Sequence, residues 1–151
     1  MGDSMTIIGI VGTDPVAKTT AAGTPMATFR LASPIRRQDR ETGAWSEVGQ
    51  NWYTVTAWRA LARNVQQSIR KGERVIVAGE LKVRPYERPD GSSGTAVDLD
   101  ARAVGHDLAF QTTTAVRVLP QRPEPARQAS EAPEAPAGPQ PDLAALAEAP
   151  F

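Results

Sequence analysis

The chain has 151 residues, of which 40% are hydrophobic, and its formal net charge is zero, so it fits one modest domain plus an appendage. It contains no cysteine, which excludes disulfides, a thiolate nucleophile and a cysteine-ligated zinc site. No run approaches the roughly 18 apolar residues of a membrane span and no signal peptide is evident, so the sequence predicts a cytoplasmic protein without a membrane segment.

The first two predicted strands differ in their burial pattern. Residues 6–11 are apolar on both faces, which predicts a strand covered on both sides and suggests a subunit contact. Residues 26–32 alternate instead, with Phe29 and Leu31 on one side and Arg30 on the other, as expected for a half-buried strand.

The third predicted strand carries two tryptophans on its outer face. A long polar hairpin loop, residues 36–50, leads into it, with turn-rich residues 39–43 at its centre. Because successive side chains of a strand alternate faces, Trp52 and Trp58 in the strand 51–58 lie opposite the apolar, core-like set. Two indoles exposed to water require a cover, and a base stacked on an aromatic ring contributes about 1–3 kcal/mol. The pattern therefore implies a ligand or a partner subunit on this face.

One amphipathic helix follows this strand. Leu61, Val65 and Ile69 are spaced at i, i+4 and i+8 within residues 60–71, and Gly72 is the expected C-terminal stop. We expect this helix to close one end of a barrel.

Two more strands complete the part of the chain that is expected to fold. Residues 73–83 form the fourth strand, and Tyr86 shares the outward face of Lys82 and Arg84, provided that Pro85 does not break the register. The fifth strand, residues 95–104, is expected to point four side chains inward: Val97, Leu99, Ala101 and Ala103. Five strands with one helix between the third and the fourth is the all-β layout of the OB-fold, a small Greek-key barrel.

The composition changes near residue 117. Eight of the 13 prolines lie in the last 34 residues, with many alanines, and such a segment cannot form a packed core. Residues 1–117 hold 15 Lys and Arg against 12 Asp and Glu, whereas residues 118–151 hold 2 against 5. The sequence thus predicts a weakly basic folded domain, residues 1–117, and an acidic, disordered Pro/Ala-rich tail, residues 118–151.

Six sequence blocks resemble those of bacterial single-stranded DNA-binding proteins and occur in the order of that family. They are residues 6–15, 23–32, 39–43, 52–58, 70–72 and 79–81. Residues 103–108 resemble the branch found in high-GC Gram-positive bacteria. The resemblance implies a domain that binds single-stranded DNA and forms a homotetramer, in a cytoplasmic, nucleoid-associated protein.

The resemblance also implies which side chains stack on bases. Three of the four aromatic stacking positions usual in the family are matched, by Trp52, Trp58 and Tyr86. The fourth holds Arg37, whose guanidinium can stack on a base or meet a phosphate. Tyr53 stands where many members have a histidine linked to subunit contacts. Packing at a subunit interface is the alternative role for the two tryptophans.

A set of basic residues flanks the stacking positions and is expected to contact DNA phosphates. The set is Arg30, Arg36, Arg40, Arg59, Lys82, Arg84 and Arg88. An ordinary solvated surface is the alternative for these side chains. Asp98 and Asp100 share one strand face, which raises the question of a metal pair, but the sequence favours a polar outer strand face.

The chain ends in Pro150 and Phe151, the residue types on which family members dock replication and repair proteins. A single acidic residue, Glu148, lies next to them, whereas the family usually has an acidic stretch. This difference predicts weak docking and suggests a paralogue with a specialised or reduced recruiting role.

The leading functional prediction is a non-catalytic binder without sequence preference, which protects single strands in replication, recombination, repair or DNA uptake. The alternative is an OB-fold interaction adaptor of the primosome type with weak nucleic-acid binding. A hydrolase is disfavoured, because the chain has one histidine and no Walker A, GxSxG or HExxH pattern. No catalytic residue, cofactor or metal ligand is therefore predicted.

Overall fold

The computed structural model describes residues 2–120, of which those up to Val118 form one compact unit. Its elements in chain order are β1 (Asp3–Val11), β2 (Val16–Thr19), β3 (Pro25–Gln38), β4 (Trp45–Trp58), α1 (Arg59–Ser68), β5 (Arg74–Glu87) and β6 (Ser93–His106). In the described part of the chain, no helix is both long and apolar enough to span a membrane.

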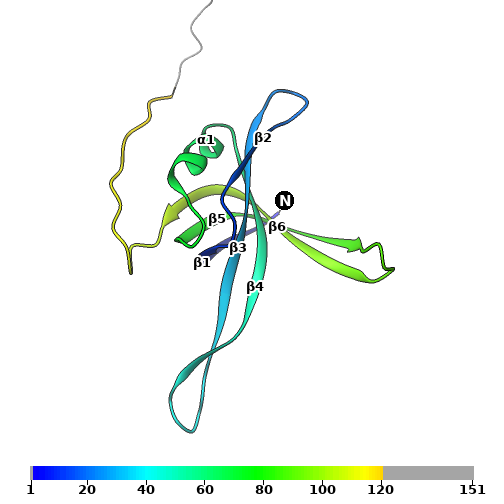
Figure 1. Ribbon diagram of the computed structural model, residues 1–151, viewed down its shortest axis with the longest axis vertical. Coiled ribbons are helices and arrows are strands. Elements are labelled where there is room, and N and C mark those ends of the chain that lie inside the picture. The colour runs from blue at the N-terminus through cyan, green and yellow to red at the C-terminus, as the bar shows by residue number, and fades with distance from the viewer. Residues whose placement is uncertain (1, 121–151) are drawn as a thin grey trace, which may run out of the picture. The chain divides into compact units, whose positions relative to one another are not determined.

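Five of the strands close into a barrel (Figure 1). β1 pairs antiparallel with β5 over most of its length and with β3 through Ile10 and Val11. The hairpins β3–β4 and β5–β6 are antiparallel, and a short parallel ladder at residues 54–56 joins β4 to β6. This closed strand order, with the helix between β4 and β5, is the OB-fold that the sequence predicts.

The barrel interior is filled by the inward-facing side chains of all five strands. The largest fully buried ones are Val11, Phe29, Leu31, Val55, Val75, Val77 and Leu99. α1 adds Ala62 and Val65 to this cluster, and Ile69, just past the end of the helix, is buried with them. Burial of each large side chain contributes about 1.5–3 kcal/mol to stability, so this cluster is the main source of the barrel's stability.

Two hairpins extend beyond the barrel in different directions (Figure 1). The prediction of a long polar loop at residues 36–50 is wrong, because β3 continues to Gln38 and β4 starts at Trp45. β5 likewise continues through Pro85, so that Tyr86 pairs with Gly94 on β6. Residues 35–48 and 82–93 are all exposed, and a strand exposed on both faces shows no apolar alternation in its sequence.

Two further differences concern the surface strand β2 and the end of α1. β2 was not predicted, because all four of its residues are exposed and, within residues 2–120, it pairs only with β3. α1 ends at Ser68 rather than near residue 71, since the backbone becomes extended at Ile69 and places that side chain in the core. Gly72 (φ 89°) lies in the following turn, where its N–H donates to the carbonyl of Val11 at 2.8 Å.

A bulge in β6 reverses the predicted direction of one side chain. Gly79 on β5 lies opposite Ala101, and the next aligned pair skips Arg102. The extra residue shifts the alternation of β6 by one position. Ala103 is therefore exposed rather than inward, and Val104 packs against the core in its place.

Among the described residues, β1 is covered on one face only. Ile7 and Val11 are buried, whereas Ile8 and Ile10 are 45% and 42% exposed on the other face. The cover that the sequence predicts for the second face does not come from residues 2–120. A subunit contact on this face stays a prediction.

Candidate nucleic-acid interface

One outer face of the barrel runs across β3, β4, β6 and β5. The strand registers align Arg30 with Thr54, Thr54 with Asp98, and Asp98 with Lys82, so these four residues form one row. Aligned residues of paired strands point to the same side of a sheet, and here the opposite side is the core. Trp52, two residues before Thr54, shares this outer face.

Trp52 is supported by the backbone at Gly12 and by the side chain of Arg30. A Cβ atom added at Gly12 would lie 2.7 Å from Cζ3 of the indole, so the ring occupies space that only glycine leaves free. The Arg30 guanidinium lies 5.5 Å from the ring centroid, and its Nη1 donates to Thr54 Oγ1 at 2.8 Å. The tryptophan is still 46% exposed, which leaves room for a flat ligand.

Tyr86 on the β5–β6 hairpin has the same kind of support. Its cross-strand partner is Gly94, where an added Cβ would lie 2.6 Å from Cζ of the tyrosine. The Arg88 guanidinium lies 5.6 Å from the ring centroid, and its Nη2 donates to the phenolic oxygen at 3.2 Å. Tyr86 is 41% exposed. A ring packed over glycine, with an arginine beside it, thus occurs at two separate places in the structure.

Trp58 lies where β4 passes into α1, beside a hollow of about 400 Å³ that Thr20, Thr24 and Arg59 also line. Arg59 has φ 54° and is the only non-glycine residue with positive φ within residues 2–120. In that part of the chain, no side chain caps the start of α1 and its first turn holds no acidic residue. The partial positive charge of the helix N-terminus is therefore uncompensated next to this indole.

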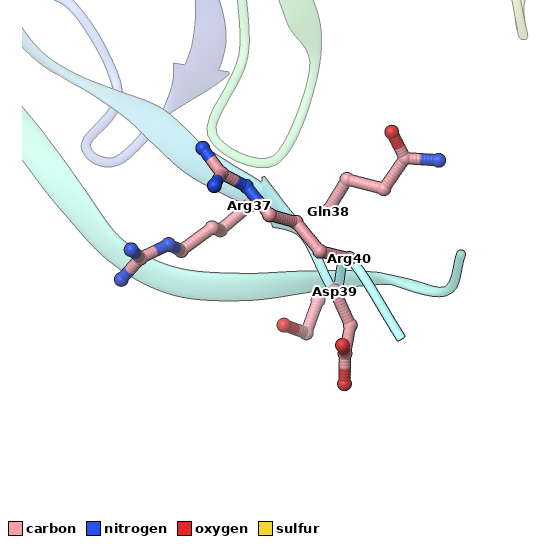
Figure 2. A pocket seen from close by; sticks show the side chains of 5 residues that line it. Arg37, Gln38, Asp39 and Arg40 are labelled. Carbon is pink, nitrogen blue, oxygen red and sulfur yellow. The ribbon is translucent and has the colours of Figure 1, made fainter. Parts of the chain in front are cut away.

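The tip of the β3–β4 hairpin carries Arg36, Arg37 and Arg40. Arg37, Asp39 and Arg40 line a hollow there, and Figure 2 shows the guanidinium groups of Arg37 and Arg40 pointing to one side and the Asp39 carboxylate to another. The Asp39 carboxylate accepts a hydrogen bond from the backbone N–H of Glu41 at 2.8 Å, which lowers the pKa of Asp39. The aspartate thus stabilises the turn, and the arginines stay exposed to solvent.

Lys82 and Arg84, two of the predicted phosphate contacts, form ion pairs within the chain. Arg84 Nε donates to Asp98 Oδ2 at 2.6 Å, and the Lys82 ammonium pairs with Asp100. Hydrogen bonding to these carboxylates raises the pKa of both basic groups. Asp98 and Asp100 therefore form part of a polar outer strand face, as the sequence favours.

The structure also identifies contributors that sequence reasoning missed. They are Gly12 and Gly94, which the sequence pattern alone does not single out. A glycine opposite an aromatic residue is a usable signal, but it requires the strand register, which the sequence does not supply. Of the predicted site residues, Pro150 and Phe151 lie outside the described residues.

A closed five-stranded barrel whose outer face presents supported aromatic rings and arginines defines an OB-fold protein with a surface suited to stacking on bases. The model of the Single-strand binding protein family matches residues 3–107. The chain belongs to this family, as the sequence blocks indicate.

Individual relatives agree with this assignment. The chain is 45% identical over 125 residues to Single-stranded DNA-binding protein 1 of Streptomyces coelicolor, covering 78% of this chain and 79% of that protein. It is 39% identical over 120 residues to Single-stranded DNA-binding protein 2 of Tropheryma whipplei, covering 80% and 78%. Both organisms belong to the high-GC Gram-positive branch that the resemblance indicates.

Two solved structures are also similar to this chain. The crystal structure of a small single-stranded DNA-binding protein from Streptomyces coelicolor has a TM-score of 0.64 and 44% identity, covering 72% of this chain and 96% of that chain. The second single-stranded DNA-binding protein (SSBb) of Mycobacterium smegmatis has a TM-score of 0.57 and 28% identity, covering 78% and 100%.

Proposed function

We propose that this protein binds single-stranded DNA without sequence preference and protects it during replication, recombination, repair or DNA uptake. The observation that carries the proposal is the exposure of Trp52, Trp58 and Tyr86 on the outside of an OB-fold barrel in a chain of this family. Every base has a flat π-face, so stacking on these rings gives affinity without selecting a sequence.

The DNA backbone is held by cationic side chains around the rings. In this proposal the phosphate contacts are Arg30, Arg36, Arg40, Arg59, Lys82, Arg84 and Arg88, with Arg37 in the remaining stacking position. Their spread over two hairpins and the start of α1 supports a path for the strand that crosses the whole outer face. Each phosphate neutralised releases counterions from the DNA, so affinity must fall as salt rises.

The working form in this proposal is a homotetramer built from the domain of residues 1–117. The second face of β1 supports assembly, because Ile8 and Ile10 are exposed there and Ile8 pairs in register with Ile76 of β5, which is also exposed. An apolar strip of this kind on a small barrel is covered when subunits associate.

We assign residues 118–151 to partner recruitment rather than to DNA binding. Pro150 and Phe151 provide a short apolar end of the kind that family members use for docking. One neighbouring acid, Glu148, supplies little charge to a basic partner. Recruitment of replication and repair proteins is therefore weak in this proposal.

Substitution of the tryptophans tests the proposed stacking. We expect Trp52→Ala and Trp58→Ala each to weaken binding of oligo(dT) by about 1–3 kcal/mol, because each removes a ring on which one base stacks. Affinity is measured by titration in dilute salt, with circular dichroism and thermal unfolding to confirm that the barrel is intact.

Trp45→Ala is the matched control, because Trp45 is 65% exposed at the hairpin tip and corresponds to no stacking position of the family. Unchanged affinity in both test variants would refute stacking at these rings. If the unaltered protein neither binds oligo(dT) in a salt-dependent way nor loses tryptophan fluorescence, the adaptor function replaces the present proposal.

A further inference from the structure

Two carboxylates lie in the middle of the proposed DNA surface. Asp98 is aligned with Thr54 of β4 on one side and with Lys82 of β5 on the other, and Asp100 is two residues further along the same strand face. A strand of DNA that crosses from the β3–β4 hairpin to the β5–β6 hairpin must pass over them. Carboxylates repel phosphates, so their presence here calls for an explanation.

In each ion pair of these carboxylates, the acidic side chain is less exposed than the basic one. The side chains of Asp98 and Asp100 are 19% and 30% exposed, whereas those of their partners Arg84 and Lys82 are 68% and 57% exposed. The acids are thus seated in the sheet surface while the cations reach out into solvent. A phosphate arriving from solution meets the cations first and competes with the seated acids for them.

We propose that Asp98 and Asp100 compete with DNA phosphates for Arg84 and Lys82 and thereby limit both the affinity and the salt dependence of binding. The inference rests on the proposed function and adds these two residues as determinants of affinity. In the free protein each acid holds one cation, and in the complex the cation moves to a phosphate.

Such an exchange is physically accessible because exposed ion pairs are weak. Once its partner has moved, the carboxylate takes up a counterion from solution, which offsets a counterion released from the DNA. The protein therefore binds less tightly, and with a shallower salt dependence, than its number of basic residues implies. Weaker binding of this kind favours redistribution along a strand over permanent capture.

Neutralising each acid without changing its shape tests the proposal. We expect Asp98→Asn and Asp100→Asn each to bind oligo(dT) about two- to fivefold more tightly, the range that corresponds to losing one exposed competing pair. The slope of log affinity against log salt should become steeper by about 0.7 for each substitution, as for one extra phosphate contact on a single strand.

The matched control is Asp3→Asn, which makes the same change in net charge on β1, opposite Leu81 and on the other side of the sheet from the ion pairs. It should leave the slope unchanged. A second comparison uses Arg84→Gln: because the cation is then missing, adding Asp98→Asn to it should not steepen the slope.

The outcomes separate the two proposals. If the unaltered protein binds oligo(dT) but both asparagine variants, folded by circular dichroism, bind equally or less tightly, the competition is refuted and the proposed function stands. A gain of the same size in Asp3→Asn would also refute it, since net charge alone would then explain the effect. Failure of the unaltered protein to bind would refute the proposed function itself. Measuring both acids keeps the test valid if one variant does not fold.

Discussion

Each supported aromatic ring combines exposure with restricted motion. Trp52 and Tyr86 pack against the backbone at Gly12 and Gly94, and Arg30 and Arg88 lie beside the rings. A ring that is already fixed in the free protein loses little conformational freedom when a base stacks on it. Restriction before binding therefore contributes affinity without adding a contact.

Substitutions of Arg59 separate the contribution of this residue to stability from its contribution to DNA binding. Its φ of 54° is unfavourable for any side chain with a Cβ, by about 1–2 kcal/mol, whereas glycine adopts it freely. We expect Arg59→Gly to raise the free energy of unfolding by about 0.5–1 kcal/mol and to weaken oligo(dT) binding, because the guanidinium beside Trp58 is lost. Urea unfolding and DNA titration on the same sample measure the two effects.

Arg59→Ala is the control for this variant, since it removes the guanidinium but keeps the backbone strain. Its affinity should fall as much as that of the glycine variant, without the gain in stability. If the glycine variant is less stable than the unaltered protein, the strained conformation does not carry the cost assigned to it.

Among the elements, the barrel could be predicted from the sequence and the outer hairpins could not. Alternation of Phe29 and Leu31 with polar residues, and of Val55 with the tryptophans, reflects a core on one side of each strand. Residues 35–48 have water on both sides, so nothing in their sequence distinguishes a strand from a loop. Strand alternation predicts that Trp52, Trp58 and Tyr86 face outward, and the family resemblance adds their stacking role. The glycine supports and the ion pairs depend on the strand register, which the sequence does not supply.

Shortening the β3–β4 hairpin tests whether its outer part serves binding rather than folding. Residues 36–48 are replaced by Asn-Gly, which joins Ile35 to its partner Gly49 through a two-residue turn. We expect the unfolding temperature to be retained, because the removed residues are all exposed. The salt slope of oligo(dT) binding should become shallower by about 1.4, because the two proposed phosphate contacts of this hairpin, Arg36 and Arg40, are lost.

Net charge does not confound this experiment, because residues 36–48 contain three arginines and three acids. A variant with unchanged affinity and slope would show that the strand of DNA does not reach the hairpin tip. A variant that unfolds would show instead that the hairpin contributes to the barrel.

At the scale of the complete barrel, the proposed assembly face and the proposed DNA face are different. The proposed DNA face crosses β3, β4, β6 and β5, whereas the exposed apolar strip lies on β1 and the adjoining part of β5. Subunits that associate through β1 therefore leave the rings available, and several copies of the DNA face can act on one strand.

Ile8→Lys tests assembly through β1. Ile8 points away from the core of its own barrel, so the chain should still fold, but a buried, unpaired ammonium at a subunit contact is strongly unfavourable. We expect light scattering to show a smaller species than the unaltered protein. Val48→Lys, at an apolar residue that is 56% exposed on the hairpin, is the control and should keep the original mass. An unaltered mass for Ile8→Lys would place the subunit contact elsewhere.

The short parallel ladder between β4 and β6 makes the DNA surface a property of the complete fold. Only this ladder, residues 54–56 against 98–100 in the described chain, joins the two hairpins directly across that face. A chain in which the ladder has opened still possesses both hairpins but lacks a continuous track between them. DNA that binds the closed barrel therefore stabilises the closed form. A ligand at a hundred times its dissociation constant raises the free energy of unfolding by about 2.7 kcal/mol. Bound single-stranded DNA thereby stabilises the fold that binds it.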